Sequence, residues 1–144
     1  MGLLSDQDSK VVREHLAALQ KPVTLLFFTQ TIGAPETAAL TRQVLDEVAG
    51  LNELIQVEEV NFVLERDRAE QYGIERIPAI ALLSAGEDTR MRFLGAPAGY
   101  EFMSLIEAVV LAGTDDSQLT AGSRDLISAH VSGPLDIHVF VTPT

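Results

Sequence analysis

Hydrophobic and polar positions in the first 113 residues follow helical and strand periods in turn. The runs Val23–Thr29 and Ile77–Leu83 are too short for most helices and predict strands that are buried on both faces. Residues 54–63 alternate and predict a third strand, and residues 89–94 predict a fourth that pairs as a hairpin across a turn at 85–88. Helical spacing predicts helices at 5–19, 36–48, 65–72 and 101–111.

The order of these elements predicts the fold class. Parallel strands joined by helices, followed by an antiparallel hairpin and a closing helix, form an α/β sandwich. The helix at 5–19 precedes the first strand and is an addition to that plan. Proline and glycine mark the boundaries: Pro22 ends the first helix, and Gly50 and Gly73 end the next two.

Residues 114–144 restart the pattern of the amino terminus. A polar connector at 114–118 leads to a predicted helix at 119–131, a Gly133–Pro134 break and a predicted strand at 135–142. The sequence FFTQT at 27–31 resembles FVTPT at 140–144, with an offset of 113 residues, and the preceding prolines differ by 112. Chance could give the five-residue match alone, but the shared order of helix, break and strand favours tandem repeats.

Composition and charge narrow the possible functions. The chain has 144 residues, 47% hydrophobic, and a formal net charge of −11, which disfavours nucleic acid and anionic membranes as partners. No apolar run approaches the roughly 18 residues of a membrane span, and the amino terminus lacks the pattern of a signal peptide. We therefore expect a cytoplasmic protein that binds neither nucleic acid nor membrane.

The chain contains no cysteine, which excludes disulfides, thiolate catalysis, cysteine-bound zinc and iron–sulfur clusters. Its histidines, His15, His130 and His138, do not have the spacing of metal ligands. Phosphate-binding glycine loops and the G-x-S-x-G motif are also absent. We expect no catalytic residue, no metal and no cofactor in this chain.

Three segments carry a family resemblance: KPVTLLFF at 21–28, IPAIALL at 77–83 and FLGAPAGYEFMSLIEAVV at 93–110. Together they resemble tandem thioredoxin-fold proteins, namely the N-terminal domain of the alkyl hydroperoxide reductase F component and the glutaredoxin-like protein disulfide oxidoreductases. The most specific part is Gly95–Phe102, in which Tyr100 stands where the family usually has histidine.

The resemblance implies a thioredoxin-like three-layer sandwich with an extra N-terminal helix and a C-terminal helix–strand extension. Residues 1–113 would form the first thioredoxin-like fold, without a C-x-x-C motif. Residues 114–144 would be a linker helix and the orphan first strand of a second thioredoxin fold. In the family, that second fold carries C-x-x-C directly after its first strand.

Aligning the two repeats places Ile32, Gly33, Ala34 and Pro35 where C-x-x-C would sit. Thioredoxin chemistry needs a nucleophilic thiolate at a helix N-terminus and a second thiol to resolve the mixed disulfide. Ile32 and Pro35 supply neither, so we interpret this site as vestigial.

The resemblance also matches Ile77–Pro78 to the proline beside the family's active site, whose peptide bond is usually cis. This segment either offers backbone groups to a peptide or only sets the start of a buried strand. Glu58 and Glu59 are expected to be partly exposed near a strand edge, rather than one of them acting as a buried proton acceptor.

These observations predict a redox-inactive thioredoxin-fold half of a dithiol–disulfide oxidoreductase, acting as a scaffold or docking unit. The alternative is a stand-alone protein- or peptide-binding module that uses the vestigial groove. We expect this chain alone to be inactive and its full-length parent to be a protein disulfide oxidoreductase or peroxiredoxin reductase. A further hypothesis is that the catalytic half is cut off at a selenocysteine codon read as a stop after Thr144.

Two kinds of partner follow. An apolar strand at 135–142 without a sheet leaves its backbone groups unpaired, so we expect it to dock on an edge of its own sheet or of a neighbour's. The arrangement that we favour is a homodimer formed through residues 135–144. The alternative is a frayed tail after about Gly133, which the polar ends would permit. The full-length parent would act on a redox partner protein, either a peroxiredoxin or a disulfide substrate.

Overall fold

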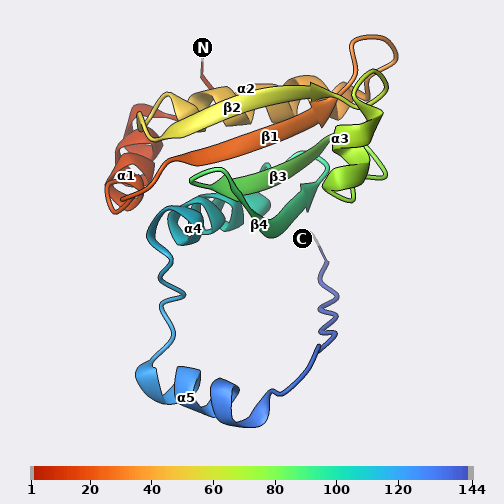
Figure 1. The fold of residues 1–144 in the computed structure, drawn as a ribbon. Coiled ribbons are helices and arrows are strands. Elements are labelled where there is room, and N and C mark those ends of the chain that lie inside the picture. Colours follow the sequence, from red (N-terminus) through yellow and green to blue (C-terminus); the bar gives the residue numbers. More distant parts are fainter. Residues whose placement is uncertain (1, 143–144) are drawn as a thin grey trace.

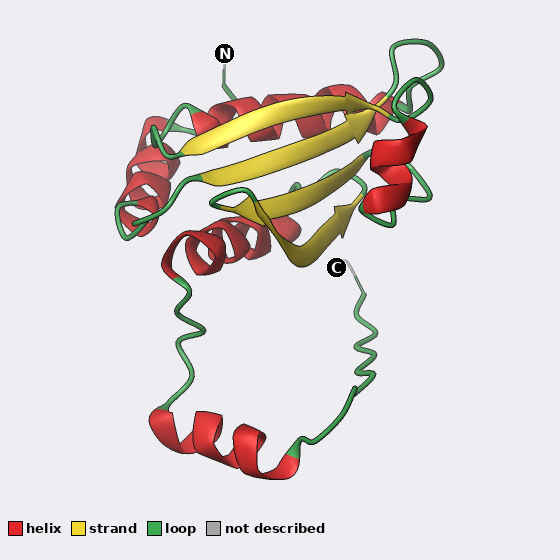
Figure 2. Ribbon diagram, viewed as in Figure 1, coloured by secondary structure: helices red, strands yellow, loops and turns green. Residues whose placement is uncertain are grey.

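A four-stranded mixed sheet forms the centre of the computed structural model, which describes residues 2–142 (Figures 1 and 2). In sheet order the strands are β2 (Ile55–Asn61), β1 (Val23–Thr29), β3 (Ala79–Ser84) and β4 (Glu87–Leu94). β1 runs parallel to β2 and antiparallel to β3, and β3 and β4 form a hairpin. The bounds of β1 coincide with those predicted from its apolar run.

Four of the described helices cover the two faces of this sheet: α1 (Asp6–Leu16), α2 (Glu36–Ala49), α3 (Arg66–Gln71) and α4 (Glu101–Thr114). A fifth, α5 (Ala121–His130), has no buried residue and does not cover the sheet. Val23, Leu25 and Phe27 of β1 belong to the core cluster shared with α1, α2 and α4. Leu26 and Phe28 point to the other face and pack in a second cluster that includes Ala69 of α3. The predicted three-layer α/β sandwich with a thioredoxin-like arrangement is confirmed.

The added amino-terminal helix is held by caps and by packing. The Ser5 hydroxyl accepts a hydrogen bond from the backbone N–H of Asp8, which satisfies one of the free donors of the first turn. Val12 and Leu16, four residues apart, are buried on the face toward the core. The helix ends at Leu16 rather than at the predicted Leu19, because the chain turns there toward the end of α4.

A carbonyl near the end of α4 binds this turn. The oxygen of Gly113 accepts hydrogen bonds from the backbone N–H groups of Gln20 and Lys21, at 2.9 and 3.1 Å. α4 therefore continues past the predicted end at residue 111, and Gly113 is buried against Leu19 and Val23. The side chains of Lys21 and Asp115 form an ion pair at the same junction.

The carboxyl-terminal segment departs from the prediction. The helix expected at 119–131 is present as α5, but none of its residues is buried. The strand predicted at Leu135–Thr142 is wrong: this segment is irregular, and Leu135, Ile137, Val139 and Val141 are exposed. Figure 1 shows α5 and the segment after it lying apart from the sheet.

The physical reason is that an apolar alternating pattern becomes a strand only when a neighbouring strand completes its hydrogen-bond ladder. The four strands described do not include residues 135–142, so the expectation that this segment joins an edge of its own sheet is also wrong. Pro143 and Thr144, the last residues of the repeat match, lie outside the described residues. None of the described helices combines the length and apolar character needed to cross a bilayer.

The α4 junction generates a test of stability. A Cβ atom at Gly113 would overlap with Cδ2 of Leu19 and lie 3.3 Å from Cγ2 of Val23, whereas nothing lies within 4 Å of a Cβ at Gly122. We expect Gly113→Ala to lower the free energy of unfolding by about 1–3 kcal/mol through overpacking. Gly122→Ala, the matched control, should change it by less than about 0.5 kcal/mol. Urea unfolding followed by circular dichroism measures both, and equal effects would contradict this account of the junction.

The exposed tail generates a test of association, since pairing with a second chain stays a prediction. If residues 135–144 mediate a homodimer, light scattering after size-exclusion should give twice the 15.6 kDa chain mass. Replacing Ile137 and Val139 together by aspartate should return the mass to that of one chain, because buried carboxylates oppose the interface. A single-chain mass for the unmodified protein would rule out the dimer.

Candidate functional site

Three connecting segments meet at one end of the sheet. β1 and β2 are parallel, and their last residues, Thr29 and Asn61, are register partners. Phe28 pairs with Ala79 across the antiparallel ladder, which places the Ile77–Pro78 segment at the same end. Figure 1 shows the arrowheads of β1 and β2 ending together near α3. The predicted vestigial motif and the predicted proline segment are therefore brought to one end of the sheet.

The loop at 30–35 presents the residues aligned with C-x-x-C. The side-chain amide of Gln30 donates a hydrogen bond to the carbonyl of Gly33, at 2.9 Å, and Gly33 has a φ of +70°, which favours glycine. Ile32 is 88% exposed, and Gly33, Ala34 and Pro35 are exposed as well. α2 begins directly after Pro35, so an alkyl group rather than a nucleophile precedes its N-terminus.

A second loop, at 61–64, stands beside the first. The side-chain oxygen of Asn61 accepts hydrogen bonds from the backbone N–H groups of Val63 and Leu64, at 3.0 and 2.9 Å. The backbone N–H of Asn61 donates a hydrogen bond to the carboxylate of Glu65, at 2.8 Å. These bonds hold the loop with Val63 62% and Leu64 82% exposed. Both loops are thus fixed by local hydrogen bonds while they present aliphatic side chains to solvent.

The two loops enclose a shallow hollow of about 220 Å³. Its lining residues are neutral: Gln30, Thr31, Ile32, Asn61, Val63 and Leu64. Exposed aliphatic groups gathered around a neutral hollow favour contact with an apolar surface rather than with a charged ligand.

Sequence reasoning missed Val63 and Leu64, which fall at the end of the predicted strand. The available signal was Asn61, a residue type that stops strands by bonding to the backbone two residues on.

The Ile77–Pro78 peptide bond is cis, as expected from the sequence. Pro78 is buried and its carbonyl accepts a hydrogen bond from the N–H of Gly95, at 2.8 Å. Ile77 packs against the cluster that contains Phe28. Neither residue lines the hollow, and their role in binding a peptide stays a prediction.

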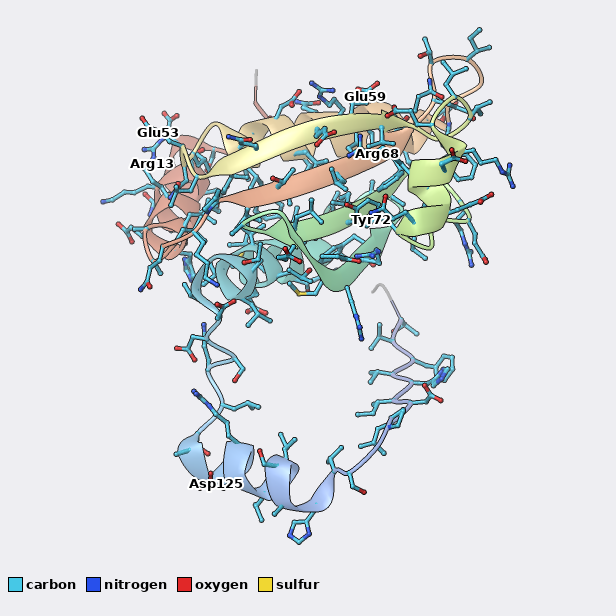
Figure 3. All side chains as sticks on the ribbon, in the orientation of Figure 1. Arg13, Glu53, Glu59, Arg68, Tyr72 and Asp125 are labelled. Carbon is cyan, nitrogen blue, oxygen red and sulfur yellow. The ribbon has the colours of Figure 1, made fainter. Side chains whose placement is uncertain are left out.

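Charged groups beside the site are already paired. Arg68 contacts Glu58 at 2.7 Å and Glu65 at 3.4 Å, and Arg42 contacts Glu59 at 2.6 Å. The pKa of Arg68 is raised above its ordinary value, chiefly by the hydrogen bond to Glu58. Glu58 and Glu59 lie on β2 at the sheet edge and are half-exposed, as expected, so neither resembles a buried proton acceptor. Figure 3 labels Glu59 on this strand.

The site therefore offers shape and apolar contact. The alignment brings no thiol to it, because the chain has none. Among residues 2–142, no group of three or more His, Asp or Glu side chains converges as a metal site would require.

Comparison with known proteins gives relatives of this fold. No protein-family model matches the chain. The F component of alkyl hydroperoxide reductase from Escherichia coli K12 is 25% identical over 129 residues, which cover 90% of this chain and 22% of that protein. The chain spans about a fifth of the length of the curated relatives it matches, at 22% and 18%.

Solved structures agree. The NTD_N/C domain of the alkyl hydroperoxide reductase F component from Enterococcus faecalis superposes with a TM-score of 0.79 and 31% identity over 88% of this chain and 60% of that one. A protein disulfide oxidoreductase from Aeropyrum pernix gives 0.72 and 24% identity over 87% of this chain and 54% of that one, which shows the fold alone. The chain thus has a thioredoxin-like fold and resembles the N-terminal domain of the F component, as its sequence predicts.

Proposed function

We propose that this chain is a redox-inactive docking unit of a dithiol–disulfide oxidoreductase. The observation that carries the proposal is Ile32, an exposed alkyl side chain at the position aligned with the first C-x-x-C residue. It stands with Val63 and Leu64 in an apolar surface that local hydrogen bonds hold in place. The resemblance to the F component of alkyl hydroperoxide reductase supports a redox-related role for the protein that contains this fold.

The chemistry of the reaction explains why this unit would bind and not react. Disulfide exchange passes through a mixed disulfide formed by a thiolate, and this chain has no cysteine. An aliphatic side chain that moves from water into an interface contributes about 1.5–3 kcal/mol when fully buried. Three such side chains at one site can therefore orient a partner while the electron transfer takes place on another fold.

The catalytic groups would belong to a second thioredoxin fold in the full-length parent, which would act on a peroxiredoxin or another disulfide substrate. In the repeat alignment, Ile32 corresponds to the position of the first cysteine of that second fold. The sequence of the full-length parent tests this: a cysteine at that position and another three residues later support the proposal, and their absence rejects it.

A second candidate function is a stand-alone module that binds peptides in the vestigial groove. The preformed neutral hollow between the loops at 30–33 and 61–64 favours it. The two candidates differ in whether the partner is a redox protein, and substitution of Ile32 in the full-length parent separates them.

The absence of thiols generates a prediction of activity. In an insulin reduction assay driven by dithiothreitol, the purified chain should leave the rate at background, while a thioredoxin run in parallel accelerates it. A clear acceleration by the chain would contradict the vestigial-site interpretation.

The apolar surface around Ile32 generates a prediction of substrate turnover. In the full-length parent, Ile32→Asp should lower kcat/KM for the disulfide substrate roughly tenfold, mainly through KM, because about 1.4 kcal/mol of interface contact is lost. Leu111→Asp is the matched control, since Leu111 is also exposed but lines a different hollow, with Ser84 and Ala85. An unchanged kcat/KM for Ile32→Asp would reject the docking role and leave the peptide-binding module as the candidate.

A further inference from the structure

A separate and larger hollow lies between α1, α2 and the start of α4. Its volume is about 490 Å³, within the range of about 300–1,000 Å³ that is usual for small-molecule sites. Apolar side chains form most of its lining: Leu3, Leu4, Val11, Val12, Leu40, Val44, Phe102 and Met103. The hollow shares no residue with the loops at 30–35 and 61–64, so it is independent of the site described above.

The floor and walls of this groove differ in their access to water. Val12 and Val44 form the floor and are buried in the main core cluster. Leu3, Val11 and Met103 stand on the walls and are exposed. Displacement of water from such a surface by an apolar body lowers the free energy of the system.

The wall nearest the amino terminus is held in place by one carboxylate. Glu47 of α2 accepts hydrogen bonds from the backbone N–H groups of Leu3 and Leu4, at 2.5 and 2.9 Å. The bond from Leu3 is the chief reason why the pKa of Glu47 lies below its ordinary value, so this carboxylate stays ionised at neutral pH. The groove is therefore preformed.

The ionisable side chains among the described residues of the lining are both acidic. They are Asp8 and Glu47, and this described lining contains no lysine, arginine or histidine side chain. Asp8 accepts a hydrogen bond from the Ser5 hydroxyl, at 2.6 Å, and has no ion pair among residues 2–142. The carboxylate of Asp8 would attract a cation at the mouth of the groove. An anion would be repelled by this carboxylate and by the net charge of −11.

We propose that this groove binds a small organic cation, with an apolar body the size of a phenylalkyl group and an ammonium group. The apolar body lies on Val12 and Val44, and the ammonium group meets the carboxylate of Asp8. A carboxylate ligand of the same shape is excluded by charge, and a neutral one lacks the ion pair.

The test uses three probes that share one carbon skeleton: 4-phenylbutylamine, 4-phenylbutanol and 4-phenylbutyrate. Titration of the ¹⁵N-labelled chain should shift the amide signals of Val11, Val44 and Met103. The amine should bind tightest, the alcohol roughly tenfold more weakly, and the carboxylate not measurably.

Three variants make the test specific. Asp8→Asn should weaken amine binding roughly tenfold and leave alcohol binding unchanged. Val11→Arg, which places a cation and extra volume on the wall, should abolish binding of the amine. Asp125→Asn removes an exposed carboxylate from α5, outside the groove, and is the matched control that should change nothing.

Equal affinities for the amine and the carboxylate would overturn the proposal, as would amine binding that is insensitive to Asp8→Asn. Signal shifts spread over acidic residues throughout the chain would show only general attraction to an acidic protein and would also overturn it. The insulin assay and the Ile32→Asp variant address a different surface, so failure here leaves the proposed docking function untouched.

Discussion

The burial of β1 on both faces is the constraint on which the rest of the structure depends. Leu25 to Thr29 are all buried, and β1 is hydrogen-bonded to a strand on each side. Its side chains alternate between the cluster under α1, α2 and α4 and the cluster under α3. One strand therefore fixes two cores, and it also sets the point at which the loop at 30–35 leaves the sheet.

That arrangement accounts for the character of the two surfaces. The loops that follow β1 and β2 lie beyond the core, so their aliphatic side chains face solvent. Hydrogen bonds donated by the Gln30 side chain and accepted by the Asn61 side chain replace packing as the source of order. The groove between α1, α2 and α4 arises because the amino-terminal helix is an addition to the basic sandwich and leaves space beside Val12 and Val44. The first surface is ordered by local hydrogen bonds. The second is ordered by the core together with the hydrogen bonds from Leu3 and Leu4 to Glu47.

The sequence predicted those parts whose stability depends on local pattern. A continuous apolar run sufficed for the bounds of β1, and Ser5 marked the start of α1. The end of α4 could not be predicted in this way. The helix continues through Gly113, which lies close to Leu19, a residue that is distant in sequence. Residues 135–142 have the pattern of a strand, but pattern carries no information about whether a partner strand is present. The sequence did not predict that Val63 and Leu64 are exposed, because apolar residues next to a strand suggest burial.

The ion pairs on β2 have a consequence for how this protein behaves in a crowded solution. An open strand edge can recruit other chains and begin aggregation, and acidic or basic side chains along the edge oppose that. Glu58 and Glu59 lie on opposite faces of this edge strand and are anchored by Arg68 and Arg42. A second strand that approached β2 would have to disturb these paired charges, and a copy of this acidic chain would bring further negative charge. These paired charges therefore oppose aggregation through the open edge of β2.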